Sequence, residues 1–173
     1  MNQTLATWNA AGAAEALEAM LACCGSKRWA AAMVALRPIG GVVELSEAAD
    51  RVWGTMQAPD WLEAFACHPR IGERKAAHAA TQAMSRSAAW SRQEQSSAKT
   101  ANELVLVELA EGNALYEQRF GFTYIVCATG KSAEEMLAIL RRRLASNRDA
   151  ELHEAAEQQR QIMQMRLGKW LVE

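Results

Sequence analysis

Apolar residues recur at intervals of three and four positions along most of this 173-residue chain. That spacing places them on one face of an amphipathic α-helix. The pattern therefore predicts an all-α protein of seven to eight helices. The expected helices cover approximately residues 13–24, 27–36, 47–56, 61–68, 73–84, 92–119, 133–144 and 149–169.

Residues 120–127 are the one stretch with a strand-like composition, because they are aromatic and β-branched. A single strand would have no pairing partner, so we expect an extended, buried segment instead. Local signals mark several helix ends. Gly25 is expected to stop the first helix, Ser26 to cap the second, and Ser132 to form a capping box with Glu135.

The composition supports a single domain over residues 1–173. Half of the residues are hydrophobic, and only three prolines and ten glycines interrupt the helical pattern. A chain of this length can enclose one substantial core. The net charge of −1 gives no reason to expect binding to nucleic acid or to an anionic membrane surface. No apolar run approaches the roughly 20 residues of a membrane span, and the N-terminus lacks an export signal, so we expect a cytoplasmic protein.

The four cysteines do not have the spacing of a metal site. Cys23 and Cys24 are adjacent, without a CxxC pair or a nearby histidine. We expect them to be small buried thiols in a reducing compartment, and we expect no metal. The chain also lacks Walker A, GxSxG and HExxH motifs, so nothing indicates a nucleotide hydrolase, a serine hydrolase or a zinc protease.

His68 is the first candidate for chemistry, because the residues around it predict a helix end. Asp60 is expected to cap this helix with Glu63 at its third position, and Pro69 should stop it at or before His68. Unpaired carbonyls and the negative end of the helix dipole favour a protonated imidazole there. Such a histidine suits acid–base chemistry, but a structural helix cap is the simpler interpretation of these residues alone.

Two further features place polar groups at informative positions. Ser91 and Glu94 have capping-box spacing at the start of the expected long helix, and a helix N-terminus can also bind an anion. Arg166 falls within the apolar stripe of the last helix, so it should be buried. A buried guanidinium needs a partner, either an internal glutamate or a carboxylate of a substrate. The three arginines at 141–143, by contrast, are expected to face solvent.

Short motifs run in a consistent order over nearly the whole chain. They are Cys23-Cys24-Gly25-Ser26 with Trp29, Arg37-Pro38, Asp60-Trp61-Leu62-Glu63-Ala64-Phe65, His68-Pro69-Arg70-Ile71-Gly72, Trp90-Ser91 with Glu94-Gln95, Phe120-Gly121-Phe122, Ile125-Val126-Cys127-Ala128, Gly130-Lys131-Ser132 and Arg166-Leu167. In this order they resemble the OHCU decarboxylases, the 2-oxo-4-hydroxy-4-carboxy-5-ureidoimidazoline decarboxylases of the ureide pathway of purine catabolism.

The resemblance implies an all-α fold, usually a homodimer, and a reaction without a metal or an organic cofactor. The implied reaction converts OHCU, a small-molecule substrate, into (S)-allantoin and carbon dioxide during urate degradation. His68 would be the catalytic acid–base residue and Glu94 its companion. The residues implied in substrate binding are Pro69, Ser91, Gln95, Phe122, Ile125, Val126, Cys127, Ala128 and Arg166.

This reaction is compatible with a site made of side chains only. Loss of carbon dioxide leaves an electron pair that the C=N bond of the imidazoline ring can accept. The enzyme therefore has to orient the carboxylate, remove its solvent and deliver a proton to one face. The alternative is a non-catalytic helical binding scaffold that keeps the fold, and a hydrolase or racemase of allantoin-like ureides is a more distant one.

Overall fold

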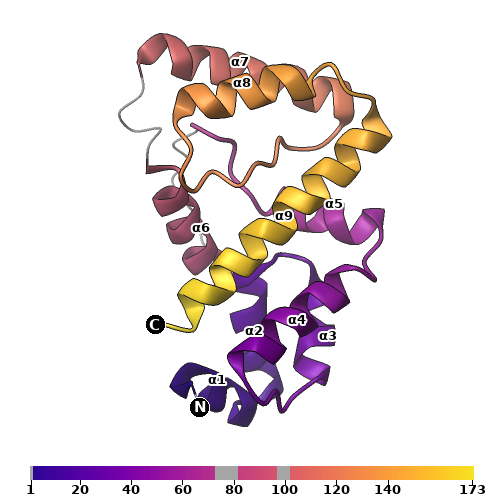
Figure 1. The fold of residues 1–173 in the computed structure, drawn as a ribbon, viewed down its shortest axis with the longest axis vertical. Helices are drawn as coiled ribbons and strands as arrows, with labels where there is room; N and C mark the ends of the chain where they lie inside the picture. Colours follow the sequence, from indigo (N-terminus) through magenta and orange to yellow (C-terminus); the bar gives the residue numbers. More distant parts are fainter. Residues whose placement is uncertain (1, 73–81, 97–101) are drawn as a thin grey trace.

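A computed structural model describes residues 2–72, 82–96 and 102–173, and its described residues contain α-helices and no β-strand (Figure 1). The all-α prediction is confirmed, but the described residues form nine helices, which is more than the seven to eight expected. The helices are α1 (Gln3–Ala10), α2 (Ala13–Cys23), α3 (Lys27–Ala35), α4 (Val42–Trp53), α5 (Ala58–Ala66), α6 (Gln82–Glu94), α7 (Glu103–Phe120), α8 (Ala133–Arg143) and α9 (Arg148–Trp170).

Two of the predicted helix caps and the bounds of the last helix are confirmed. The Ser26 side chain accepts a hydrogen bond from the Trp29 N–H and caps α3. Ser132 and Glu135 form the expected capping box at the start of α8. The last helix, expected over residues 149–169, is found within one residue of those bounds at each end.

Other helix starts were predicted wrongly. α1 was not expected at all, because it is a short helix with only two buried side chains, Leu5 and Trp8. α4 begins before Ser46, which lies inside the helix. α5 begins after Gln57, so Asp60 is not the N-cap; its carboxylate instead accepts the Gln57 N–H from the third helical position.

The expected long helix opening at Ser91 is also wrong. Ser91 lies in the last turn of α6, and α7 starts only after Asn102, whose side chain accepts the Leu104 N–H. The helix expected over residues 73–84 falls mostly outside the described residues, since α6 begins at Gln82.

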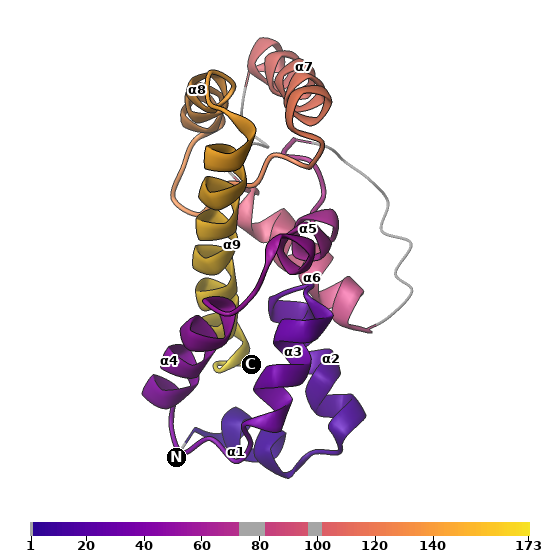
Figure 2. The same cartoon turned by 90° about the vertical axis from the view of Figure 1, so that its right-hand side faces the viewer.

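α9 is the longest helix, and it connects the two ends of the molecule. It packs against α2, α4, α5 and α7. In Figures 1 and 2, α7 and α8 lie side by side at one end, and α1 to α4 gather around the other. None of the helices in the described ranges is both long and apolar enough to cross a membrane.

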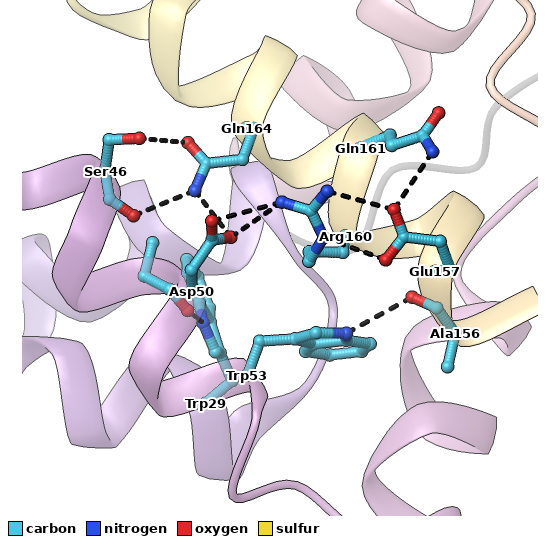
Figure 3. Close-up of polar contacts among 10 residues, drawn as sticks. Trp29, Ser46, Asp50, Trp53, Ala156, Glu157, Arg160, Gln161 and Gln164 are labelled. Carbon is cyan, nitrogen blue, oxygen red and sulfur yellow. Dashed lines mark hydrogen bonds and ion pairs between the residues drawn. The ribbon is translucent and has the colours of Figure 1, made fainter. Parts of the chain in front are cut away.

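Side-chain hydrogen bonds fix the position of α9 against α4 (Figure 3). Both carboxylate oxygens of Asp50 accept from Arg160 Nη1 at 3.1 Å, and the Gln164 amide donates to the Ser46 carbonyl at 2.8 Å. The Trp53 indole donates to the Ala156 carbonyl at 3.2 Å. These contacts set the rotation of α9, and with it the direction in which the opposite face of this helix points.

Residues 121–128 cross between the helices without regular structure, as expected for an extended buried segment. Phe122 packs against Phe65 and Tyr116, and the Ile125 carbonyl accepts from Arg143 at 2.6 Å. Arg143 is buried and paired with the buried Glu151, so the prediction of a solvent-facing run is wrong for this arginine.

Candidate active site

His68 lies directly after α5, where the sequence predicted the helix to stop. The helix ends at Ala66 with Cys67 as C-cap, and the His68 N–H still donates to the Phe65 carbonyl at 3.1 Å. The imidazole turns toward α9, where its Nε2 lies 2.7 Å from Oε1 of Gln159. His68 is therefore not only a helix cap, because its side chain enters a polar contact with another helix.

The loop after His68 is held by side chains of α7 and by Gln95, the residue that follows α6. Arg70 binds the Glu117 carboxylate through two hydrogen bonds of 2.7 and 2.5 Å. Asn113 donates to the Ile71 carbonyl at 3.0 Å, and the Gln95 side-chain oxygen accepts the Gly72 N–H at 3.1 Å. Gln95, expected to bind substrate, thus also holds the loop that carries His68.

On the other side of His68, Gly25 allows the turn before α3 to approach Cys67 closely. A Cβ atom at this position would lie 2.4 Å from Sγ and 2.8 Å from Cβ of Cys67. Both distances are far below van der Waals contact, so a larger residue would displace Cys67 and the adjacent His68. This steric requirement explains why a glycine occupies its position in the Cys23-Cys24-Gly25-Ser26 motif.

The second part of the site is the buried pair of Arg166 and Glu94, whose side chains are 2% and 6% exposed. Arg166 Nε and Nη2 donate to the two Glu94 oxygens at 3.0 and 3.1 Å. Nη2 also donates to Ser91 Oγ at 2.8 Å, and Nη1 donates to Ser87 Oγ at 2.9 Å. Lys169 lies 3.5 Å from Glu94 and adds a second positive charge.

This arrangement decides between the alternatives left open for Arg166. Its burial is confirmed, and its partner is an internal glutamate. Four of its five N–H groups bind side chains of the described residues, which leaves one N–H on Nη1 for another ligand. The capping box at Ser91 is wrong, because Ser91 is buried inside the last turn of α6 and its hydroxyl accepts from Arg166.

The two parts of the site share one face of α9, with Gln159 and Arg166 about two turns apart. They are close enough to influence each other electrostatically. Burial, followed by the positive charge of Arg166, lowers the pKa of His68 to about 4. The expectation that the helix end would favour a protonated imidazole is therefore wrong, because removal from water outweighs the helix dipole.

Glu94 keeps its charge in this environment. Burial by itself would raise the pKa of this carboxyl, but the hydrogen bonds and charge of Arg166 more than compensate and hold the pKa below its usual value. At neutral pH the site therefore contains a neutral imidazole, a carboxylate and a guanidinium.

We expect the neutral state of His68 to make folding stability depend on pH. Between its ordinary pKa of 6.5 and about 4, the unfolded chain binds a proton at this residue that the folded protein does not. Stability is therefore complete above this range and falls as pH drops through it, with a slope of about 1.4 kcal/mol per pH unit. Urea unfolding across the range should show a slope smaller by about one proton in His68→Asn, and equal slopes would contradict a neutral imidazole in the folded protein.

The role of the apolar residues predicted to line the site stays a prediction, and the structure gives their burial. Phe122, Ile125, Val126 and Ala128 are buried, and Cys127 is half-buried. Many backbone groups of this segment already have internal partners. The Cys127 N–H donates to Gln158 Oε1 at 2.9 Å, the Cys127 carbonyl accepts from Lys131, and the Ala128 carbonyl accepts from the Lys131 N–H. Pro69, next to His68, is half-buried.

Sequence reasoning missed the functional interest of Gln159. It was recognised only as a member of the buried stripe of α9, in which it is the polar position nearest to the middle. An amide within an otherwise apolar stripe was a usable signal, as it was for Arg166. Among the described residues, no group of three histidine, cysteine or acidic side chains could hold a metal ion.

Comparisons with known proteins identify related sequences and structures. A family model described as OHCU decarboxylase matches residues 9–168. The uric acid degradation bifunctional protein TTL of Arabidopsis thaliana is 36% identical over 148 residues, which cover 85% of this chain and 44% of the plant protein. The 2-oxo-4-hydroxy-4-carboxy-5-ureidoimidazoline decarboxylase of Haloferax volcanii is 26% identical over 133 residues, covering 77% of this chain and 74% of that protein. This chain thus spans less than half of the plant relative but most of the archaeal one.

Solved structures share the fold. A crystal structure of OHCU decarboxylase in the presence of (S)-allantoin superposes with a TM-score of 0.74 and 33% identity, covering 90% of this chain and 99% of the other. A crystal structure of (S)-allantoin synthase has a TM-score of 0.70 at 19% identity, covering 96% of this chain and 53% of the other. The second likeness concerns the fold alone.

Proposed function

Since the chain belongs to the OHCU decarboxylase family, we propose that it converts 2-oxo-4-hydroxy-4-carboxy-5-ureidoimidazoline into (S)-allantoin and carbon dioxide. The observation that carries the proposal is that both parts of the site contact the same face of α9. This face carries Gln159, which contacts the neutral imidazole of His68, and Arg166, which pairs with the buried Glu94.

The reaction breaks the bond between the ring carbon and the carboxylate. The electron pair of that bond moves into the adjacent C=N group, whose nitrogen takes up one proton. Transfer of the hydroxyl proton to the ureido-bearing carbon then forms the carbonyl of allantoin and sets its stereochemistry. Two proton movements are thus required, and neither needs an external electron acceptor.

We assign the hydroxyl proton to His68. A neutral imidazole can accept this proton as the carboxylate leaves and then return it to the ring carbon from one side. Its low pKa keeps it in the required neutral form at physiological pH. The imidazolium formed in this step is transient, and the carboxylate of Glu94 stabilises it by charge.

The remaining residues are proposed to orient the substrate. Ser91 and the remaining N–H of Arg166 would bind a polar edge, and Gln95 would do so beside the loop that it holds. Pro69 and Phe122 would form the apolar wall that excludes water from the leaving carboxylate. The segment from Ile125 to Ala128 would face the ring, with Val126 supplying backbone groups that have no partner among the described residues.

The test generates the unstable substrate in place by oxidising and hydrolysing urate, and follows the circular dichroism of allantoin. The expected result is rapid growth of the (S)-allantoin signal in proportion to protein concentration, above the slow racemic background. A non-catalytic scaffold would leave the background unchanged, which would overturn the proposal. Racemic allantoin added alone should give no signal, and a signal there would indicate an enantioselective hydrolase instead. The signal of pure (S)-allantoin should persist, and its loss would indicate a racemase or a hydrolase.

A homodimer and a cytoplasmic location stay predictions. One feature supports the dimer, because α7 exposes three apolar side chains that lie along one side of the helix, Leu104, Val107 and Leu115.

A further inference from the structure

We propose that Gln159 is a positioning residue that holds His68 in one tautomer. Its side-chain oxygen would keep the proton on Nε2 of His68, so that Nδ1 is the atom that exchanges a proton with the substrate. The effect on catalysis rests on the proposed decarboxylase function, whereas the effect on the imidazole itself does not.

The contact between the two side chains carries the inference. Gln159 is fully buried on α9, and its Oε1 lies 2.7 Å from Nε2 of His68. A carbonyl oxygen can only accept a hydrogen bond, so Nε2 must donate. A neutral imidazole has one N–H, and the Nδ1 lone pair is therefore left free.

Stability does not explain why an amide occupies this position. The Nε2 of Gln159 is buried and has no partner among the described residues. Leaving such a donor unpaired costs about 1–3 kcal/mol, which offsets the comparable gain from the hydrogen bond to His68, so an apolar side chain of similar size should be about equally stable here. An apolar side chain, however, cannot accept a hydrogen bond from His68.

The opposite orientation of the amide would suit catalysis less well. It would direct an amide N–H of Gln159 at Nε2 of His68, which keeps the imidazole proton on Nδ1. It would also leave the carbonyl oxygen of Gln159 buried without a partner. An N–H group would also oppose the positive charge that His68 acquires when it takes up a proton. The oxygen, in contrast, stabilises that charge, together with Glu94 and against the nearby Arg166.

Nuclear magnetic resonance of protein labelled in histidine nitrogen and carbon tests the tautomer directly. The chain has three histidines, and the His68 signals can be assigned by their loss in His68→Asn. At neutral pH we expect the Nε2–H tautomer in the wild type and a mixture of tautomers in Gln159→Met. A wild-type imidazole in the Nδ1–H tautomer would overturn the proposal.

Kinetics provide the second test, with Gln161→Met as the matched control. Gln161 is an exposed glutamine on the same helix, and it donates to Glu157 (Figure 3). We expect Gln159→Met to lower kcat by about 10- to 100-fold with little change in KM and no loss of thermal stability. The control should keep wild-type kcat. A Gln159→Met enzyme within about twofold of the wild type would contradict the positioning role.

Gln159→Glu distinguishes positioning from packing. A carboxylate at this site still accepts from Nε2–H, and its charge should raise the pKa of His68 and move the acidic limb of the kcat profile to higher pH. A limb that stayed in place would show that the side chain at position 159 does not contact the imidazole that titrates during catalysis, and would contradict the positioning role. If the wild type made no (S)-allantoin above background, the proposed function would fail. The tautomer of His68 and the change in its pKa could still be measured by nuclear magnetic resonance.

Discussion

Replacing His68 with asparagine will lower the rate of (S)-allantoin formation by about 10²- to 10⁴-fold, the contribution typical of a positioned acid–base group. Asparagine is polar and smaller than histidine, so the turn after α5 can still form. It cannot take up the hydroxyl proton and return it to the ring carbon. The measurement is the initial rate of the circular dichroism signal with substrate generated from urate.

His153→Asn is the matched control for this variant. His153 is an exposed histidine of α9 whose Nδ1 lies 2.8 Å from the Asp149 carbonyl. It should keep the wild-type rate. A His68→Asn enzyme that formed (S)-allantoin as fast as this control would remove His68 from the mechanism, and Glu94 would become the first candidate for the proton transfer.

Arg166→Met will lower both stability and activity. Among the described residues, it leaves the buried Glu94 carboxylate with Lys169, at 3.5 Å, as its remaining ion-pair partner. Breaking a buried ion pair from one side costs about 3–5 kcal/mol in the free energy of unfolding. Activity should also fall, because Ser91 loses its donor and the site loses its guanidinium. Urea unfolding and the allantoin assay measure the two effects.

Two comparisons separate the buried pair from its function. Arg141→Met breaks an exposed pair with Glu108, so it should cost less than about 1 kcal/mol and leave activity unchanged. The double variant Glu94→Leu with Arg166→Met removes both charges, and should recover most of the lost stability. An active double variant would show that the pair supports the fold alone.

The elements that could be predicted from the sequence are those with local signals. Ser26 and the Ser132–Glu135 box act on backbone groups within a few residues, so each was recognised correctly from the sequence. The stripe of α9 repeats over six turns, and its buried Arg166 was expected from that spacing alone. The start of α4 has no side-chain cap and was misplaced, and the short α1 was missed although the Asn2 side chain caps it.

Errors concentrated where a local pattern had two physical solutions. Ser91 and Glu94 have the spacing of a capping box, yet the same spacing inside a helix places both side chains on the face toward Arg166. Arg143 belongs to a run of three arginines that suggests a solvated face. The third of them points inward, because Glu151 and the Ile125 carbonyl can bind it there.

By itself the sequence determined the all-α class, most helix ends, and the positions of His68, Glu94 and Arg166 as candidates for chemistry. Only the tertiary structure decided that Arg166 binds Glu94, that Gln159 binds His68, and that the imidazole is neutral. Helix ends depend on neighbours in the chain, which a sequence displays directly. Partner choice and protonation depend on which groups from distant segments exclude water together, and that is settled only when α5, α6 and α9 are packed.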